Sequence, residues 1–335
     1  MQIHRRHVIL TGAAAAALAA GGCAGTSMRP DAASMPQWRA FTAADGTTIQ
    51  YEQWLPEAKP RAVVQIVHGA AEHGARYDRF ARALVREGYA VVADDHRGHG
   101  RTRLRSGKLG DAGPDAWNRM VEDEIALTER LRAQFPGARL VLFGHSLGSF
   151  MAQDYLTRAA RLVDAVVLSG TSYGPPPPQA LLDACEAAAR AEPLGPSKIW
   201  SDLFADFNKP FADRPGFEWL SRDADEVRKY TSDPQAGFAF TNELVRDIFV
   251  GFARLRDPAR EARVPRSTPI LVIQGALDPV GENLKGTQAL LDRYRALGLT
   301  RVDHRFYAGG RHEVLNETNR DEVTRDVIEW MDRTV

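Results

Sequence analysis

The sequence predicts an α/β fold in which a mostly parallel, doubly wound sheet carries an inserted helical cap. Three observations support this prediction. Short apolar runs of Val, Ile and Leu alternate with amphipathic helical segments along most of the 335 residues, as expected of a parallel sheet covered by helices on both faces. A glycine-flanked turn joins one such run to a helical segment within residues 139–158. Residues 173–266 then interrupt the alternation, which indicates an insertion between two core strands.

The first 23 residues have the pattern of an export signal rather than of a folded segment. Arg5 and Arg6 precede the apolar run Val8–Ala20, which is shorter than the ~20 residues of a membrane-spanning helix. Twin-arginine and Sec export both stay open. Residues 20–23 (Ala-Gly-Gly-Cys) resemble a bacterial lipobox. We therefore expect an exported envelope lipoprotein anchored to the membrane through Cys23, on the periplasmic side or the surface. The alternative is cleavage without lipidation, which gives a free periplasmic or secreted protein.

The composition argues against a nucleic-acid partner and against a disulfide scaffold. The chain has 43 basic residues (Lys and Arg), 43 acidic residues and a formal net charge of zero, whereas nucleic-acid-binding proteins usually have a basic excess. Its two cysteines are Cys23 and Cys185, so lipidation of Cys23 would leave no intrachain disulfide. Cys185 lies in the helical stretch Gln179–Arg190, where we expect a small core residue. The sequence gives no indication of the oligomeric state.

The core elements follow in a regular order after a flexible tether at residues 24–37. Residues 41–54 have the pattern of a hairpin that turns at Asp45 and Gly46. The expected strands are Ala62–Val67, Ala90–Asp94, Leu140–Phe143, Ala165–Leu168, Ile270–Gln274 and Val302–Phe306. The expected helices are Arg76–Glu87, Ala116–Gln134, Gly148–Arg158, Thr287–Leu297 and Arg320–Met331. Residues 38–172 and 267–335 are accordingly predicted to form the core.

Residues 173–266, called the cap segment below, are predicted to form a helical cap. The segment begins with four prolines at 175–178, a stiff polyproline entry. Its stretch Asn242–Arg256 places apolar side chains at helical spacing on one face. It also contains 12 of the 28 aromatic residues of the chain. We expect these aromatic residues to form both the core of the cap and an apolar underside suited to a ligand.

The strongest chemical signal is the turn around Ser146. Residues 144–148 read Gly-His-Ser-Leu-Gly and lie between the apolar run Arg139–Phe143 and a helical segment. A strand, a sharp turn at serine and a helix define a nucleophile elbow, in which the serine Oγ is exposed on a strained backbone. An ordinary tight turn is the alternative. We expect Ser146 to be a nucleophile.

An acid and a base for this serine follow in chain order. A serine hydroxyl needs a general base to take its proton. Asp278 comes shortly after the apolar run Ile270–Ile273, and His312 lies in a loop after the strand that ends near Tyr307. Both would sit at the carboxyl ends of parallel strands, where open α/β sheets bind ligands. We expect His312 to be the base and Asp278 to hold its imidazole. A turn aspartate before proline and a surface histidine are the alternatives.

Two backbone N–H groups are expected to stabilise the developing oxyanion. Leu147 supplies one because it directly follows the nucleophile. The second should come from the loop after the strand Ala62–Val67, where Ala70 is the best placed residue. This scheme requires no cofactor and no metal.

The motifs together resemble those of a known family. The stretches that carry the resemblance are His68-Gly69-Ala70, Glu72-His73, Arg76-Tyr77-Asp78, residues 95–100 (Asp-His-Arg-Gly-His-Gly), the Ser146 elbow, Asn208-Lys209, residues 218–222, residues 278–281 and Arg311-His312-Glu313. The chain is similar, over roughly residues 38–333, to the monoacylglycerol lipase and lysophospholipase branch of the α/β-hydrolases. By position, the resemblance implies a triad of Ser146, Asp278 and His312, with Ala70 and Leu147 as oxyanion donors. The export signal departs from the many cytoplasmic relatives.

The resemblance also assigns the remaining clusters. It implies that residues 94–99, with Asp94, His96 and His99, form a structural loop beside the site rather than a metal centre. His68 and His145 are expected to pack or hydrogen-bond. The basic residues of the cap segment, Lys209, Arg214, Arg222, Arg228 and Lys229, are expected to be solvated charges, with contact to a phosphate headgroup as the alternative.

The function expected from the sequence is therefore serine-dependent hydrolysis of carboxylic esters of single-acyl lipids, monoacylglycerols or lysophospholipids. The substrate would be a small acyl ester or lipid. Three alternatives stay open. The first is a carboxylesterase for small esters, and the second is a serine peptidase or thioesterase on the same fold. The third is a non-catalytic, lipid-binding envelope lipoprotein.

Overall fold

The computed structural model describes residues 35–102, 106–211 and 216–335. The predicted export signal with Cys23, most of the predicted tether and Arg214 lie outside the described residues. Among the described residues, no helix has both the length and the apolar character needed to span a bilayer.

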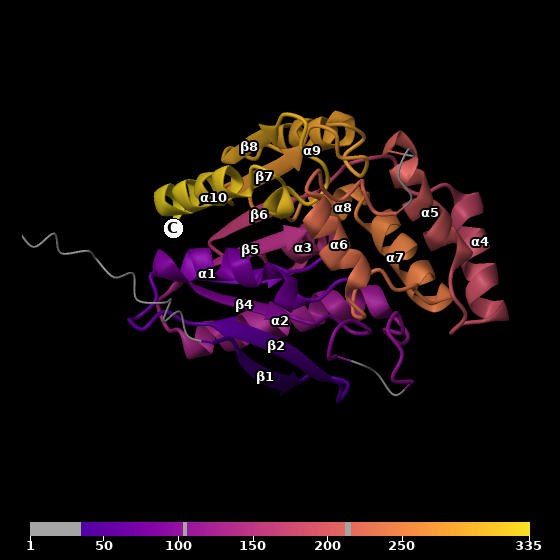
Figure 1. Cartoon of the computed structure of the whole chain (residues 1–335), viewed down its shortest axis with the longest axis horizontal. Helices are drawn as coiled ribbons and strands as arrows, with labels where there is room; N and C mark the ends of the chain where they lie inside the picture. The colour runs from indigo at the N-terminus through magenta and orange to yellow at the C-terminus, as the bar shows by residue number, and fades with distance from the viewer. Residues whose placement is uncertain (1–34, 103–105, 212–215) are drawn as a thin grey trace, which may run out of the picture. The chain divides into compact units, whose positions relative to one another are not determined.

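One eight-stranded sheet organises the described residues, in the order β1-β2-β4-β3-β5-β6-β7-β8 (Figure 1). The strands are β1 Gln37–Thr42, β2 Thr48–Trp54, β3 Ala62–Val67, β4 Ala90–Asp94, β5 Arg139–His145, β6 Ala165–Ser169, β7 Ile270–Gly275 and β8 Val302–Tyr307. β1 and β2 form an antiparallel hairpin, and β2 also pairs antiparallel with β4. All other neighbouring strands are parallel. The predicted mostly parallel sheet is confirmed, and the six strands expected after the hairpin are present with ends that differ by at most two residues.

Helices cover both faces of this sheet. The core helices are α1 Asp78–Arg86, α2 Ala116–Gln134, α3 Leu147–Ala159, α9 Lys285–Ala296 and α10 Arg320–Thr334, with short 3-10 turns at η1 Gly74–Tyr77, η2 Ala160–Leu162 and η4 Val314–Asn316. The predicted start of the first helix at Arg76 differs from the structure, because residues 74–77 form the tighter 3-10 turn before α1 begins.

The alternation of side chains along each strand explains the two layers of helices. Val63 and Leu142 belong to the cluster that contains the apolar residues of α2, α3 and α9. Val64 and Phe143 belong to the opposite cluster, with the apolar residues of α1 and α10. Successive strand residues point to opposite faces, so a continuous apolar run feeds both clusters. Each fully buried Val, Leu or Ile contributes about 1.5–3 kcal/mol to folding.

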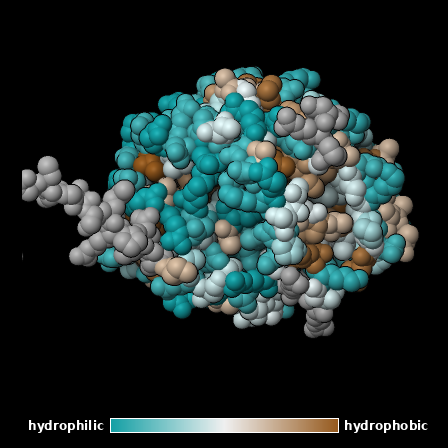
Figure 2. All heavy atoms as spheres, in the orientation of Figure 1, coloured by the Kyte–Doolittle hydropathy of each residue, from teal (hydrophilic) through white to brown (hydrophobic). Residues whose placement is uncertain are grey.

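The cap segment is helical and lies in the chain between β6 and β7. It contains α4 Gln179–Ala191, α5 Lys198–Asn208, η3 Lys209–Phe211, α6 Ala224–Ser232, α7 Asn242–Arg254 and α8 Pro258–Glu261. Figure 1 shows α4–α8 gathered at one end of the sheet, on the right of the view. Figure 2 shows a largely hydrophilic face on which hydrophobic residues are more frequent over these helices. Cys185 of α4 is buried in the core, as predicted.

Three helices of the cap segment were not predicted, although their first residues carry a signal. α5, α6 and α8 follow Ser197, Asp223 and Asp257, and each of these side chains accepts a hydrogen bond from a backbone N–H of the first turn. Serine and aspartate are favoured at this position because they satisfy donors that have no partner within the helix. The capping residues could therefore have located these short helices from the sequence.

Candidate active site

Ser146 occupies a strained turn between β5 and α3. Its φ of 52° and ψ of −121° lie outside the regions that residues with a side chain usually adopt. The turn is held by a hydrogen bond of 2.9 Å from its backbone N–H to the carbonyl of Ser169 on β6. A Cβ atom at Gly144 would lie 2.5 Å from the carbonyl oxygen of Gly148. A Cβ at Gly148 would overlap the carbonyl of Val67. The two glycines are thus required for the close crossing of strand and helix.

Asp278 and His312 form a buried pair at the same end of the sheet. Asp278 lies in the turn after β7, His312 lies in the loop after β8, and both side chains are inaccessible to solvent. The Asp278 carboxylate accepts a hydrogen bond of 2.8 Å from His312 Nδ1. It also accepts bonds from the Gln274 amide at 2.5 Å and from the backbone N–H of Val280 at 2.9 Å. Because Nδ1 is the donor, the lone pair of the neutral ring resides on Nε2.

Gln274 is a positioning residue that the sequence interpretation missed. It is the last side chain of β7 before Gly275 and is fully buried in an otherwise apolar strand. Its amide nitrogen donates to Asp278, and its amide oxygen accepts from the backbone N–H of Thr171 at 2.9 Å. A buried amide satisfied on both ends fixes the orientation of the carboxylate. The polar residue at the end of an apolar run was the signal that could have identified it.

His312 Nε2 is buried and has no hydrogen-bond partner among the described residues. Buried polar atoms are nearly always paired, so an unpaired one requires an explanation. The His312 ring and Ser146 each lie against a glycine: a Cβ added at Gly170 would be 2.8 Å from His312 Cε1, and a Cβ added at Gly69 would be 3.1 Å from Ser146 Cβ. The ring of His145 lies 4.8 Å from that of His312. The structure therefore brings the regions of Ser146 and His312 together, with no hydrogen bond between the two side chains.

Ala70 and Leu147 both line the cavity onto which Ser146 opens. Neither of their backbone N–H groups donates a hydrogen bond to the described residues. The next residue in the loop, Ala71, has a positive φ of 52°. Its carbonyl accepts bonds from the Tyr230 hydroxyl at 3.2 Å and from the Gly237 N–H at 2.9 Å. Two contacts from the cap segment thus hold the loop that carries the Ala70 N–H.

A buried ionic cluster joins this loop to the loop of His312. Glu72 accepts a bond of 2.5 Å from the backbone N–H of Gly69 and pairs with Arg76. The Arg76 guanidinium also makes two bonds of 2.8 Å to the carboxylate of Glu313, the residue after His312. Burial alone would raise the pKa of Glu313, but the charge and hydrogen bonds of Arg76 outweigh it and lower that pKa to about 2. One cation therefore positions both loops.

The cavity beside Ser146 is large and mainly apolar. Its volume is about 430 Å³, within the range of small-molecule sites. Besides Ser146 and the two N–H groups, its wall contains Phe150, Leu181, Trp200, Leu203, Phe204, Phe207, Trp219, Phe249, Phe252, Val280 and the prolines at 175–178. Most of these side chains come from the cap segment, so the expected apolar underside is present. The arrangement suits an extended apolar ligand placed next to the Ser146 side chain.

The comparisons with known proteins agree with this geometry. The family described as "Serine aminopeptidase, S33" matches residues 58–319. The chain belongs to this family of α/β-hydrolases. It is a serine hydrolase of the monoacylglycerol lipase-like branch.

Three relatives illustrate the likeness. The monoacylglycerol lipase of Mycolicibacterium smegmatis is 29% identical over 87% of this chain and 95% of its own length. A solved structure titled "Lipase (Open form)" is 31% identical, with a TM-score of 0.80, 90% of this chain and 99% of that chain covered. A thermostable carboxyl esterase from Bacillus coagulans, solved with glycerol, is 28% identical. Its TM-score is 0.82, and the match covers 89% of this chain and 98% of that chain.

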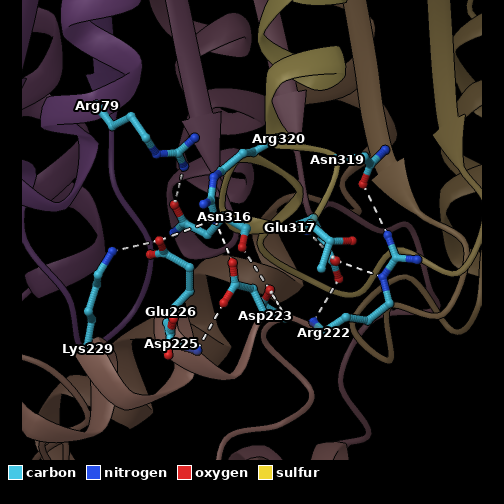
Figure 3. A network of polar contacts seen from close by, with 12 residues as sticks. Arg79, Arg222, Asp223, Asp225, Glu226, Lys229, Asn316, Glu317, Asn319 and Arg320 are labelled. Atoms are coloured by element: carbon cyan, nitrogen blue, oxygen red, sulfur yellow. Dashed lines mark hydrogen bonds and ion pairs between the residues drawn. The ribbon is translucent and has the colours of Figure 1, made fainter.

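A second ionic network fastens the cap segment of this hydrolase to the loop that carries His312 (Figure 3). The fully buried carboxylate of Glu317 accepts bonds from Arg222 Nε at 2.8 Å and from the backbone N–H of Arg311 at 2.8 Å. Arg320, at the start of α10, pairs with Asp223 at 2.7 Å. The stretch before α6 is therefore held against the same loop as His312.

His68, His96 and His99 form a second buried histidine cluster beside the site of this α/β-hydrolase. His96 Nδ1 faces Asp94 at 2.9 Å, and its Nε2 faces the His68 carbonyl at 3.1 Å, so both nitrogens donate. Although burial opposes a charge, Asp94 raises the pKa of His96 well above its ordinary value. His68 donates through Nδ1 to the Gly69 carbonyl and accepts the His96 N–H through Nε2.

The same cluster has the composition of a metal site, because His68, His96 and Asp94 present ligand atoms close together. Every ring nitrogen of the two histidines already makes a hydrogen bond, and the rings stack at 3.6 Å. His99 donates through Nδ1 to the Arg97 carbonyl and accepts the Ala71 N–H through Nε2. Burial, followed by the charge of His96, lowers the pKa of His99 to about 3. The hydrogen bonds thus give this cluster a structural role.

The described basic residues of the cap segment named above are paired with carboxylates. The pairs are Lys209 with Asp206, Arg222 with Glu317, Arg228 with Asp225, and Lys229 with Glu226. Arg222 and Lys229 have buried partners, whereas the pairs of Lys209 and Arg228 are exposed and contribute little to stability.

Proposed function

We propose that this protein hydrolyses carboxylic esters of single-acyl lipids through Ser146, His312 and Asp278. The observation that carries the proposal is the unpartnered, buried Nε2 of His312, held by Asp278 beside a strained serine that opens onto an apolar cavity. Acyl transfer by a serine requires a base with a free lone pair, a nucleophile next to it and a cavity that binds the acyl group.

The proposed reaction proceeds in two steps. His312 Nε2 takes the proton of Ser146 as Oγ bonds to the ester carbonyl carbon, and Asp278 stabilises the imidazolium. The N–H groups of Ala70 and Leu147 bind the oxyanion. The tetrahedral intermediate breaks its bond to the alcohol, which leaves with the proton from His312. His312 then takes a proton from water as the water oxygen bonds to the acyl carbon. The second tetrahedral intermediate breaks its bond to Oγ, which regains the proton from His312, and the fatty acid leaves.

The apolar lining of the cavity favours substrates with a long acyl chain. Its aromatic and aliphatic walls remove apolar surface from water at about 25 cal/mol per Å², so each added methylene should strengthen binding. The M. smegmatis relative is a monoacylglycerol lipase, which is consistent with this substrate class.

The test is hydrolysis of p-nitrophenyl esters from two to sixteen carbons by the purified protein without residues 1–22, followed by monoacylglycerol and lysophospholipid. Ser146→Ala should lower kcat by at least about 10⁴-fold with an unchanged melting temperature. Ser201→Ala, the same chemical change at an exposed position of α5, is the matched control and should retain activity. Activity of Ser146→Ala near that of the wild type would overturn the proposal.

The assay also separates the remaining alternatives. A preference for acetate or butyrate would indicate a small-ester carboxylesterase. Because the family description names an aminopeptidase, an aminoacyl amide and an acyl thioester belong in the same series, and a preference for either would replace the lipid-ester proposal. Failure of Ser146 to react with a fluorophosphonate probe would favour the non-catalytic, lipid-binding alternative.

We also propose that the chain is exported and anchored through a lipid on Cys23, as the pattern of residues 1–23 indicates. The expected result is metabolic labelling with palmitate that disappears in Cys23→Ser, together with recovery of the wild type in the membrane fraction. An unlabelled protein in the soluble periplasmic fraction would contradict the anchor.

A further inference from the structure

Two charged side chains line the otherwise apolar cavity beside Ser146 among the described residues: Arg256, just after α7, and Glu282, in the turn before α9. Glu282 is exposed to solvent, whereas Arg256 is half-buried. An uncompensated cation in an apolar wall is costly. Its presence there calls for a binding partner.

The contacts of Arg256 satisfy only part of its guanidinium. Nε donates to the carbonyl of Gly174 at 2.9 Å, and Nη1 makes a long contact of 3.4 Å with the carbonyl of Leu255. The guanidinium lies 4.1 Å from the ring centroid of Tyr173. A guanidinium has five N–H donors, so several remain available. No carboxylate of the described residues forms an ion pair with Arg256.

Carboxylates compensate two other arginines in enclosed surroundings, whereas the half-buried Arg79 donates to the Leu315 carbonyl and to Asn316 Oδ1 instead. Arg76 pairs with Glu72 and Glu313, and Arg97 pairs with Asp123. The nearest acid to Arg256 on α8, Glu261, is paired with Arg293 of α9. Burial accordingly lowers the pKa of Arg256, whereas the carboxylates that surround Arg76 raise the pKa of that residue despite its burial.

Arg256 lines the same cavity as Ser146. Residues 170–178, called the strap below, leave the carboxyl end of β6 and form part of the cavity wall. Arg256 donates a hydrogen bond to the carbonyl of Gly174 in this strap. The first residue of the strap, Gly170, lies against His312, because a Cβ atom added at Gly170 would be 2.8 Å from His312 Cε1. Four residues span at most about 14 Å, so the Cα of Gly174 is no farther than this from that of Gly170.

We propose that Arg256 binds a phosphate group of the substrate, so that the preferred esters are lysophospholipids rather than neutral monoacylglycerols. This inference rests on the proposed ester hydrolysis. Planar guanidinium groups suit phosphate because they donate two parallel hydrogen bonds to its oxygens. The apolar wall would hold the acyl chain while the half-buried cation holds the phosphate on the glycerol side of the ester. The exposed Glu282 in the same wall is compatible with a headgroup that also carries an ammonium.

The test compares kcat/KM for lysophosphatidylglycerol, lysophosphatidylcholine and monoacylglycerol with the same acyl chain. We expect the wild type to prefer the two phosphate-bearing substrates. Arg256→Met should lower kcat/KM for these by roughly 10- to 100-fold, mainly through KM, and change that for monoacylglycerol by less than threefold. Arg256→Lys should recover part of the loss, because it keeps the charge. Arg254→Gln, which changes an exposed arginine at the end of α7, two residues before Arg256, is the matched control.

Glycerol 3-phosphate provides an independent measurement. It should inhibit hydrolysis of a p-nitrophenyl ester competitively in the wild type and much less in Arg256→Met. Equal losses of Arg256→Met on neutral and phosphate-bearing substrates would show that Arg256 only fixes the strap, which overturns the inference. A wild-type preference for monoacylglycerol would also overturn it. Inactivity of the wild type on all three esters would instead refute the proposed ester hydrolysis.

Discussion

Two buried histidine–carboxylate pairs lie near each other in this molecule, and they differ in the hydrogen bonding of the second ring nitrogen. In the pair His312–Asp278, the ring nitrogen Nε2 has no partner among the described residues. In the pair His96–Asp94, the second ring nitrogen donates to the His68 carbonyl. The His312 ring retains a lone pair beside the proposed nucleophile Ser146, whereas the His96 ring uses both nitrogens to hold two loops together. Burial and a carboxylate partner alone therefore do not distinguish the proposed catalytic base from a structural histidine.

The largest expected effect comes from replacing His312, whose Nε2 has no partner among the described residues. His312→Gln should lower kcat/KM by at least about 10⁴-fold, because the amide offers no base at the position of Nε2. The free energy of unfolding should change by no more than about 1 kcal/mol, since glutamine retains a donor for Asp278. Steady-state kinetics and urea denaturation measure the two quantities. A loss of activity that merely followed a loss of folded protein would show that the two pairs are equivalent.

The opposite outcome is expected for His96, whose two ring nitrogens both donate hydrogen bonds. His96→Phe keeps a ring against His68 but leaves Asp94 buried without its cation, which should cost about 3–5 kcal/mol of unfolding free energy. The kcat/KM of each folded molecule should stay within about tenfold of the wild type. Urea denaturation gives the stability, and titration with a fluorophosphonate probe counts the competent sites. A thousandfold loss per titrated site would place this cluster in the chemistry.

A third group sharpens the comparison, because Glu52 is also buried with an unpartnered oxygen but does not line the cavity. Burial, with a smaller contribution from Asp95, raises the pKa of Glu52 from 4.5 to about 7. Between these pH values the folded state binds more protons than the unfolded state, so stability falls as the pH rises. Glu52→Gln should remove this slope and stabilise the protein at pH 8 by about 1–2 kcal/mol.

The measurement is the unfolding free energy of Glu52→Gln from pH 4 to pH 8, with the exposed Glu87→Gln as the matched control. The kcat/KM of Glu52→Gln should equal that of the wild type. A loss of activity in Glu52→Gln would contradict this comparison, because it would show that a buried unpartnered atom contributes to activity even when it does not line the cavity. The sign is opposite for Glu313: its pKa is lowered to about 2, so its contribution is present above pH 4.5 and is lost as the pH falls towards 2.

Much of the core was predictable because the signals are local. A parallel strand buried on both faces must be continuously apolar, and this located β3 and β4 with the ends that the structure has. The positive φ of Ser146 follows from the same reasoning, since a sharp turn between strand and helix leaves no other conformation. Chain order placed Asp278 and His312 on loops that the structure then brings into contact.

The sequence by itself thus determined the strands, the elbow and the residues with the right chemistry, because backbone periodicity and turn chemistry act over a few neighbouring residues. Only the tertiary structure decided which polar groups meet. Arg76 and Glu313 are 237 residues apart in the chain, and Tyr230 reaches the carbonyl of Ala71 across 159. It also placed Arg256 in the cavity wall without forming an ion pair between this side chain and any carboxylate of the described residues. Such pairings depend on how helices and loops pack at one edge of the sheet, and no local pattern encodes them.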